Sequence, residues 1–159
     1  MTFALLTVSD SRAAGKGVDL SGVELARWVE MAGGFVAQQQ VVGDTQTMIS
    51  RAILSMCGSC DVVITTGGTG LGPRDVTPEA TKSVIEREVP GIAEMLRAVG
   101  MKNNQYACLS RGVAGTVGNS LVINLPGSPK AINESMEALL DILPHAVALL
   151  RGRTDHPEQ

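Results

Sequence analysis

The sequence predicts a single α/β domain in which helices cover both faces of a mostly parallel central sheet, a three-layer α/β/α arrangement. Its 159 residues are an ordinary length for one domain with one core. Residues 2–9, 62–64 and 121–125 are mostly apolar runs, as expected of strands buried on both faces. Helical patterns separate these runs, and strands that alternate with helices indicate a parallel sheet. We assign residues 1–151 to this domain and residues 152–159 to a flexible C-terminal tail.

The amino-terminal third contains two strand–helix units. Polar residues 10–19 after the first strand predict a loop, and a helix from Ser21 ends at Gly33-Gly34. Its apolar positions repeat at helical spacing: Leu25, Ala26, Val29 and Ala32. Residues 35–42 predict a second strand, nearer an edge because it carries three glutamines. Asp44 stands at the N-cap position of the next helix, whose buried face carries Ile49, Ala52, Ile53 and Met56.

The rest of the chain continues the alternation. Residues 61–66 predict the third strand, and Thr77-Pro78-Glu79 opens a helix with Thr77 as N-cap and Pro78 at the first helical position. Pro90-Gly91 interrupts it, and a second helical stretch runs to about Val99. Residues 106–110 predict a short strand, followed by a glycine-punctuated segment over 111–119. Ser128-Pro129 opens one final helix with an apolar face of Ile132, Met136, Leu139, Leu140, Leu143, Val147 and Leu150.

Composition excludes several classes of partner. Thirteen basic and sixteen acidic residues give a formal charge of −3, and only four residues are aromatic, so nucleic-acid binding is not expected. No run approaches the roughly 18 apolar residues of a membrane span. Because Met1 leads directly into a strand with no basic leader, we expect a cytoplasmic protein with no membrane contact.

The cysteines suggest no chemistry of their own. Cys57-Gly58-Ser59-Cys60 has C-x-x-C spacing, but a zinc site needs further ligands and the two histidines, His145 and His156, are single and distant. A redox pair gains from a helix N-terminus, whereas Cys57 closes a helix. We interpret the pair as two small buried hydrophobic residues.

The run from Thr65 to Glu79 is the strongest functional signal. A strand, a glycine-dense loop and a helix N-terminus are the parts that hold phosphate groups. The run matches neither common fingerprint, because Pro73-Arg74 replaces the Lys-Ser/Thr of a Walker A loop and Pro73 replaces the third glycine of a dinucleotide loop. A tight turn without a ligand is the alternative. Hydroxyl, amide and guanidinium donors favour phosphate binding: Thr65, Thr66, Gly67, Gly68, Thr69, Gly70 and Arg74.

Two carboxylates follow strands at the same predicted edge of the sheet. Asp44 and Asp75 each have a simpler interpretation as a helix cap or a loop-fixing carboxylate. Facing bound phosphates, however, they would need a bridging cation, and Mg²⁺ is the usual one. That layout is typical of phosphoryl or nucleotidyl transfer. Two further loops reach this edge, namely Ser9-Asp10-Ser11-Arg12 and Leu125-Pro126-Gly127-Ser128-Pro129-Lys130, the latter suited to an anionic or pterin-like group.

Several ordered motifs resemble the MogA/MoaB family, whose molybdopterin-binding domain is also found in gephyrin. The resemblance extends from Thr7 to about Arg151, nearly the whole chain. It is carried by the segments Thr65-Thr66-Gly67-Gly68-Thr69-Gly70, Pro73-Arg74-Asp75-Val76-Thr77-Pro78-Glu79-Ala80-Thr81, Leu109-Ser110-Arg111-Gly112 and Ile123-Asn124-Leu125-Pro126-Gly127-Ser128.

The resemblance implies a role in molybdenum cofactor biosynthesis, as a molybdopterin adenylyltransferase. The terminal phosphate of molybdopterin would attack the α-phosphorus of Mg-ATP, giving adenylyl-molybdopterin and pyrophosphate. By analogy, Asp44 and Asp75 would position Mg²⁺ and the triphosphate. The backbone of Gly67 to Gly70 and Thr69 would hold nucleotide phosphates, and Ser9 and Asp10 would line the site. Ser110, Arg111 and the turn of Pro126, Gly127 and Ser128 would face the pterin.

The same resemblance leaves an alternative open. Several members carry a basic residue near the positions of Val117 or Asn119, and this chain carries none, which removes one contact to the phosphate of the substrate. Its short, loop-poor form is closer to MoaB, where some members are not catalytic. A non-catalytic, MoaB-like protein that holds molybdopterin or a pathway partner is therefore the second interpretation. Family members form trimers, sometimes hexamers.

Overall fold

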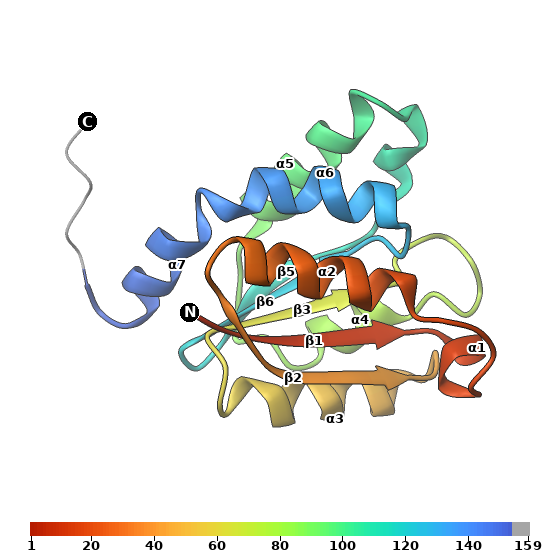
Figure 1. Ribbon diagram of the computed structural model, residues 1–159, viewed down its shortest axis with the longest axis horizontal. Helices are drawn as coiled ribbons and strands as arrows, with labels where there is room; N and C mark the ends of the chain where they lie inside the picture. Colours follow the sequence, from red (N-terminus) through yellow and green to blue (C-terminus); the bar gives the residue numbers. More distant parts are fainter. Residues whose placement is uncertain (154–159) are drawn as a thin grey trace.

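The computed structural model describes residues 1–153; residues 154–159 of the predicted tail lie outside the described residues. The middle layer is a six-stranded sheet of order β2-β1-β3-β6-β5-β4 (Figure 1). Its strands are β1 (Thr2–Val8), β2 (Phe35–Val42), β3 (Val62–Thr66), β4 (Arg87–Glu88), β5 (Ala114–Val117) and β6 (Ser120–Leu125). The predicted α/β class is confirmed, and β2 lies at an edge as its glutamines indicated.

The sheet is parallel over most of its width. β1 pairs in parallel with β2 and β3, and β3 pairs in parallel with β6. β5 runs antiparallel to β6 and to β4. Val117 pairs with Ser120, which leaves Gly118-Asn119 as a two-residue hairpin turn, and Gly118 has the positive φ of 54° that such a turn requires. The glycine-punctuated segment over 111–119, for which no strand was predicted, thus contains β5 and this turn.

Helices cover both faces of the sheet. One face carries α2 (Leu20–Met31), α5 (Pro90–Met101), α6 (Pro129–Leu140) and α7 (Leu143–Leu150). The other carries α3 (Gln46–Cys57) and α4 (Thr77–Lys82). Figure 1 places α2 and α6 on one side of the strands and α3 on the other. Successive residues of β1 alternate between two cores, with Phe3 and Leu5 in the first and Ala4 and Leu6 in the second. No helix within residues 1–153 is long and apolar enough to span a membrane.

Three local predictions were wrong. The expected loop over 10–19 begins with a short helix, α1 (Asp10–Ala13), whose N-cap Ser9 accepts the Arg12 N–H. The expected strand over 106–110 is the 3₁₀ helix η1 (Gln105–Leu109), which starts where Asn104 Oδ1 accepts the Tyr106 N–H. The single final helix is two, α6 and α7, because Pro144 has no N–H to continue the helical hydrogen bonds.

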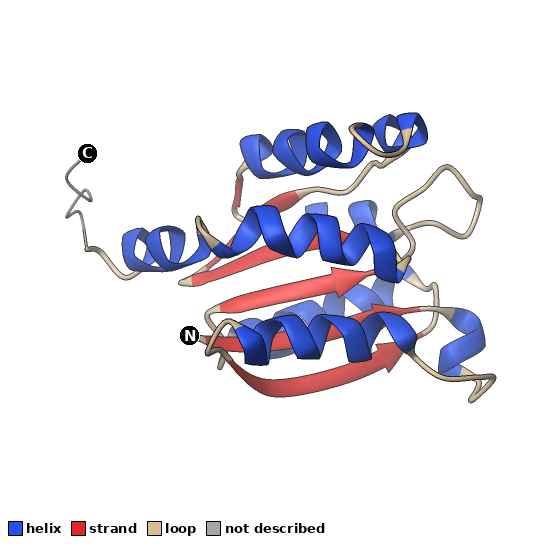
Figure 2. Ribbon diagram, turned by 45° about the horizontal axis from the view of Figure 1, so that its top comes forward, coloured by secondary structure: helices blue, strands red, loops and turns tan. Residues whose placement is uncertain are grey.

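The carboxyl ends of the parallel strands all point the same way. Figure 2 shows that α1 and the long loop after β3 lie on the side to which the arrowheads of β1, β2 and β3 point. The sequence expectation that the unusual post-strand segments meet at one edge of the sheet is therefore confirmed.

Candidate active site

Residues 67–76, hereafter the glycine loop, follow β3 and begin by packing closely against the backbone of the neighbouring strands. Gly67 and Gly68 have φ of 93° and 65°, a region that side chains other than glycine rarely adopt. A Cβ on Gly67 would lie 2.4 Å from Val8 O of β1. The Gly67 N–H donates to Leu125 O of β6 at 3.1 Å. Glycine is therefore required where the loop passes between the ends of two strands.

Thr77 closes this loop instead of capping α4. Val76 occupies the N-cap position, and Thr77 is already helical. The Thr77 hydroxyl donates to Gly67 O at 2.9 Å, and its N–H donates to Gly68 O at 3.1 Å. The N-cap prediction for Thr77 was wrong because its hydroxyl binds the loop that precedes the helix.

Asp75 lies at the far end of the glycine loop and holds a turn. Its Oδ2 accepts the Gly72 N–H at 2.8 Å, and its own N–H donates to Gly72 O at 2.9 Å. The same oxygen is 2.9 Å from the position that a Cβ of Gly70 would take. The loop-fixing interpretation of Asp75 is thus correct for one carboxylate oxygen, while Oδ1 keeps acceptor capacity for a ligand.

Asp44 joins the loop after β2 to the loop after β1. The Asp10 N–H donates to Asp44 Oδ2 at 2.8 Å, and the Asp44 N–H donates to Asp10 Oδ1 at 2.9 Å. Thr45, not Asp44, occupies the N-cap position of α3, without a side-chain cap bond. The N-cap prediction for Asp44 was wrong because its carboxylate is engaged by the Asp10 backbone, a contact that only the parallel sheet creates.

Arg74 connects this carboxylate pair to the tip of the glycine loop. Its Nη2 lies 2.6 Å from Asp10 Oδ2. The pKa of Asp10 is lowered by the Asp44 N–H, and further by Arg74, which together outweigh desolvation. Asp44 Oδ1 lies 3.3 Å from the position that a Cβ of Gly68 would take. Three predicted loops therefore meet at one place, with Asp44 beside the start of the glycine loop and Arg74 reaching back to it.

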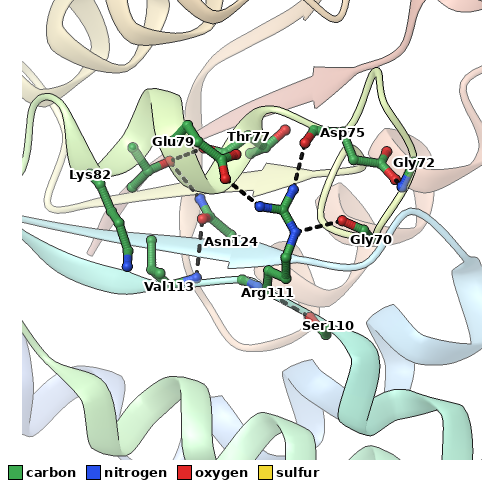
Figure 3. A network of polar contacts seen from close by, with 12 residues as sticks. Gly70, Gly72, Asp75, Thr77, Glu79, Lys82, Ser110, Arg111, Val113 and Asn124 are labelled. Atoms are coloured by element: carbon green, nitrogen blue, oxygen red, sulfur yellow. Dashed lines mark hydrogen bonds and ion pairs between the residues drawn. The ribbon is translucent and has the colours of Figure 1, made fainter.

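Arg111 binds the other flank of the glycine loop (Figure 3). Its guanidinium donates to Gly70 O at 2.7 Å and to Asp75 O at 2.6 Å, and it forms an ion pair with Glu79. Its backbone N–H donates to Thr69 O at 2.9 Å. The predicted place of Arg111 on the pterin side stays a prediction; in the structure the guanidinium is directed toward the glycine loop.

A cavity of about 220 Å³, lined by both polar and apolar residues, lies beside the first residues of this loop. Four predicted site residues line it: Ser9, Thr66, Gly67 and Gly127. The Thr66 hydroxyl is fully buried and has no hydrogen-bond partner among residues 1–153. An orphaned buried hydroxyl costs about 1–3 kcal/mol, so an unpaired one in the wall of this cavity is unusual.

A second cavity, of about 260 Å³, lies beside the later loop residues. Five predicted site residues line it: Thr69, Gly70, Ser110, Pro126 and Ser128. Its remaining wall comes from α5, α6 and η1 and includes the apolar side chains of Leu96, Tyr106 and Leu109. The glycine loop and the turn of residues 126–128 contribute to both cavities, so the two open side by side.

Sequence reasoning missed several polar residues of the first cavity. Asp19 and Ser21 line it beside Arg12 of the predicted Ser9–Arg12 loop, and neither was assigned to the site from the sequence. Asp19 is the N-cap of α2, accepting the Gly22 N–H at 2.9 Å, and its other oxygen accepts the Thr7 hydroxyl at 2.7 Å. The Asp-x-Ser-Gly pattern at a helix start, after the first strand, was the signal that could have found them.

Asp44 and Asp75 are the residues predicted to bind a magnesium ion. The described residues hold no group of three or more His, Cys, Asp or Glu side chains that could ligate a metal ion. Mg²⁺ commonly binds through one or two carboxylates together with water and substrate phosphates. Each of these aspartates uses Oδ2 for a backbone N–H and retains Oδ1, so each has one carboxylate oxygen of the kind that Mg²⁺ binds.

The C-x-x-C pair has the properties of packing residues. Cys60 is buried, and burial raises the pKa of the Cys57 thiol to about 11. Redox and metal chemistry need the thiolate, which such a pKa disfavours at neutral pH. The Ser120 hydroxyl contacts Cys57 O and Cys60 O, each at 2.6 Å, which holds the turn after α3 against β6.

This chain is similar to known proteins over nearly its whole length, including the loops of the candidate site. The family model described as "Probable molybdopterin binding domain" matches residues 4–145. The molybdopterin adenylyltransferase of Helicobacter pylori strain J99 is 39% identical over 152 residues, 93% of this chain and 86% of the relative. That of Escherichia coli K12 is 33% identical over 168 residues, 96% and 86% of the two chains.

Solved structures agree with these sequence relatives. The structure of the molybdopterin biosynthesis enzyme MoaB from Thermus thermophilus superposes with a TM-score of 0.89 at 43% identity, covering 95% of this chain and 96% of that one. The range matched by the family model contains every loop described above.

Proposed function

This chain belongs to the MogA/MoaB family of molybdopterin-binding domains, and from that premise we propose that it is a molybdopterin adenylyltransferase of molybdenum cofactor biosynthesis. The observation that carries the proposal is the glycine loop between two cavities, with Asp44 at its start and Asp75 at its end. Two neighbouring cavities suit a reaction that joins two substrates. Asp44 and Asp75 do not line them, but each lies against the glycine loop that contributes to both, Asp44 near Gly68 and Asp75 near Gly70 and Gly72.

The proposed reaction is a nucleotidyl transfer. A terminal phosphate oxygen of molybdopterin attacks the α-phosphorus of ATP, a new P–O bond forms, the bond to the α,β-bridging oxygen breaks, and pyrophosphate leaves. Backbone N–H groups of the glycine loop and the Thr69 hydroxyl bind the phosphates. Asp44 and Asp75 would hold a magnesium ion, which would neutralise triphosphate charge. The chain's contribution is thus positioning and charge compensation.

The lining of the cavities supports an assignment of the substrates. The larger cavity combines Ser110, Pro126 and Ser128 with apolar side chains, which suits a flat heterocycle such as the pterin. The smaller one is rich in hydroxyl groups and contains the orphaned Thr66 hydroxyl, which suits the polar nucleotide. Ser9, which lines the smaller cavity, and its neighbour Asp10 then belong to the nucleotide side of the site.

The test is pyrophosphate release from ATP by the purified protein, measured with and without molybdopterin and with and without Mg²⁺. We expect release only when both are present, and its loss in Asp44→Ala and Asp75→Ala. Asp141→Ala is the matched control, because Asp141 caps the end of α6 away from the loops. Unchanged turnover in both site variants contradicts the mechanism.

A second candidate is a MoaB-like protein that binds molybdopterin without catalysis. The similarity to the Thermus thermophilus MoaB structure favours considering it, as does the absence of a basic residue near Val117 and Asn119. Isothermal titration decides between the two. Tight molybdopterin binding together with no pyrophosphate release supports the binding protein.

The proposal includes an assembled, cytoplasmic protein. We expect a homotrimer or hexamer, and contact with other proteins of the pathway that supply molybdopterin or take up its adenylylated form. Large exposed apolar side chains at the start of α2, Val18 and Val23, support a subunit interface there. Light scattering coupled to size exclusion measures the mass, and a monomer at micromolar concentration contradicts this part.

A further inference from the structure

The Arg111 side chain holds both ends of one segment of the glycine loop. Nε donates to Gly70 O and Nη2 to Asp75 O, while Nη1 pairs with the Glu79 carboxylate (Figure 3). The three acceptors come from the loop and from the first turn of α4. A planar guanidinium can bind three acceptors in fixed directions, which an ammonium group cannot.

The segment held in this way has weak attachments elsewhere. Residues 71–74 are exposed, and the Gly72–Asp75 bonds are internal to the turn. The Arg74–Asp10 ion pair also ties the segment to the body of the domain, but its side chains are 65% and 52% exposed. Exposed pairs contribute about 0–1 kcal/mol. The position of Asp75 therefore depends on Arg111 more than on Arg74.

Glu79 orients the guanidinium. It lies in the first turn of α4, and burial alone would raise its pKa, but the Arg111 guanidinium lowers it below its ordinary value. The carboxylate thus stays ionised at neutral pH and fixes the direction in which the Nε and Nη2 atoms point. Since both side chains are partly exposed, the pair matters through this orientation more than through its own stability.

We propose that Arg111 is a positioning residue for the transfer reaction: it fixes the segment from Gly70 to Asp75 so that the Asp75 carboxylate meets the magnesium ion and the phosphates. This inference rests on the proposed function. It differs from a direct contact between Arg111 and the pterin, which would need the charge but not the three-way geometry.

The experiment compares Arg111→Met and Arg111→Lys with the wild type in the pyrophosphate assay. We expect kcat to fall about tenfold or more in both variants, because small misplacements of reacting groups cost up to about 10²-fold. The Mg²⁺ concentration for half-maximal rate rises, while KM for molybdopterin changes less than about twofold. The kcat of Glu79→Gln, in which the guanidinium is still present, should lie between those of the wild type and Arg111→Met.

Arg151→Met is the matched control. Arg151 also pairs with an aspartate, Asp61 at 2.5 Å, but near the start of β3 at the opposite end of the sheet. We expect this variant to lose stability and keep its kcat. Thermal unfolding of every variant separates loss of folded protein from loss of turnover.

Amide hydrogen exchange gives a readout that does not depend on activity. In Arg111→Met the amides from Gly70 to Asp75 should exchange faster, with no change in β1 or β6. Unchanged exchange, wild-type kcat in Arg111→Lys, or a raised KM for molybdopterin with unchanged kcat overturns the proposal. A wild-type protein that releases no pyrophosphate overturns the proposed function and the catalytic half of this inference, while exchange still decides whether Arg111 holds the loop.

Discussion

The two ends of the sheet each carry an aspartate paired with an arginine, and the two pairs differ in what they leave open. Before the start of β3, Asp61 receives the Thr2 N–H at 2.8 Å, the Thr2 hydroxyl at 3.1 Å and Arg151 at 2.5 Å. After the end of β1, Asp10 receives one backbone N–H and Arg74. The Asp61 side chain is 11% exposed and the Asp10 side chain 52% exposed.

The difference distinguishes a structural carboxylate, Asp61, from carboxylates that can still bind a ligand. At the amino end, three donors converge on one nearly buried carboxylate and tie the first residue of β1 to the start of β3. At the carboxyl end, Asp10, Asp44 and Asp75 bind backbone N–H groups with part of their acceptor capacity, in and against the glycine loop and the loop after β1. The same pair of residue types therefore has different roles, because Asp61 is more buried and receives one more donor, the Thr2 hydroxyl, than Asp10.

The largest expected effect tests the open end. Asp75→Asn should lower kcat for adenylyl transfer about 100-fold, because the side chain loses the charge that faces the magnesium ion. The Asn oxygen can still accept the Gly72 N–H, so the thermal midpoint should change by about 3 °C or less. Steady-state kinetics and thermal unfolding measure the two quantities. A large fall in the thermal midpoint with little change in kcat would show that Asp75, like Asp61, acts in stability and not in catalysis.

Asp61→Asn tests the closed end. We expect a loss of about 2 kcal/mol in the free energy of unfolding, since hydrogen bonds to a charged group contribute about 1.5–3 kcal/mol. The kcat of the folded protein should stay at the wild-type value. Urea unfolding gives the free energy, and an unchanged midpoint would show that the hydrogen-bonded Asp61 carboxylate contributes nothing to stability.

The same carboxylate predicts a pH dependence. Burial raises the pKa of Asp61, but the Thr2 N–H and hydroxyl and Arg151 lower it by more, so the folded pKa lies below the unfolded value of about 3.9. Its stabilisation is complete above the unfolded pKa and is lost as pH falls through the folded pKa. Urea midpoints from pH 6 to about pH 2 should therefore fall more steeply for the wild type than for Asp61→Asn; parallel curves contradict this.

Two neighbouring threonines sharpen the comparison within one strand. Thr65 Oγ1 accepts an N–H of Asn124 at 2.9 Å, whereas the Thr66 hydroxyl has no partner among the described residues. Thr65→Val should cost about 1 kcal/mol, and Thr66→Val should cost nothing or stabilise the protein by up to about 1 kcal/mol. Thr66→Val should also weaken nucleotide binding. Equal stability losses in both variants would contradict the assignment of the orphaned hydroxyl.

The smallest effect concerns the thiols. Cys108 is exposed, whereas Cys60 is buried and the pKa of Cys57 is raised to about 11. An aromatic disulfide reagent at pH 7.5 should modify one thiol quickly and two slowly, without loss of activity. Cys108→Ser should remove the fast phase. A fast phase of two thiols would reopen the question of a reactive C-x-x-C pair.

The sequence predicted the elements that are defined by local chemistry. Apolar runs located β1, β3 and β6, and the Ser128-Pro129 pair located the start of α6, where Ser128 does cap the helix. The strands β4 and β5 were not predicted because Arg87–Glu88 and Ala114–Val117 have no apolar run of their own; β5 forms by pairing with β6, and β4 by pairing with β5. Contacts between distant segments leave no local pattern.

The candidate site divides in the same way. Residue types and order indicated which loops carry the phosphate-binding and acidic groups, and the motifs indicated the family. The contacts of those groups depend on residues outside their local segment. The Asp44 carboxylate accepts the Asp10 N–H and does not cap α3, and the Thr77 hydroxyl donates to Gly67 O and does not cap α4. Arg111 reached the glycine loop from 36 residues beyond Asp75.

The sequence by itself thus determined the fold class, the family and the loops that form the site, because hydrophobic periodicity and motif order are local properties of the chain. Only the tertiary structure decided which carboxylates are saturated, which hydroxyl is orphaned and which arginine holds the loop. A donor or acceptor is satisfied by whatever the folded backbone brings within about 3 Å, and that partner is a property of the packed sheet.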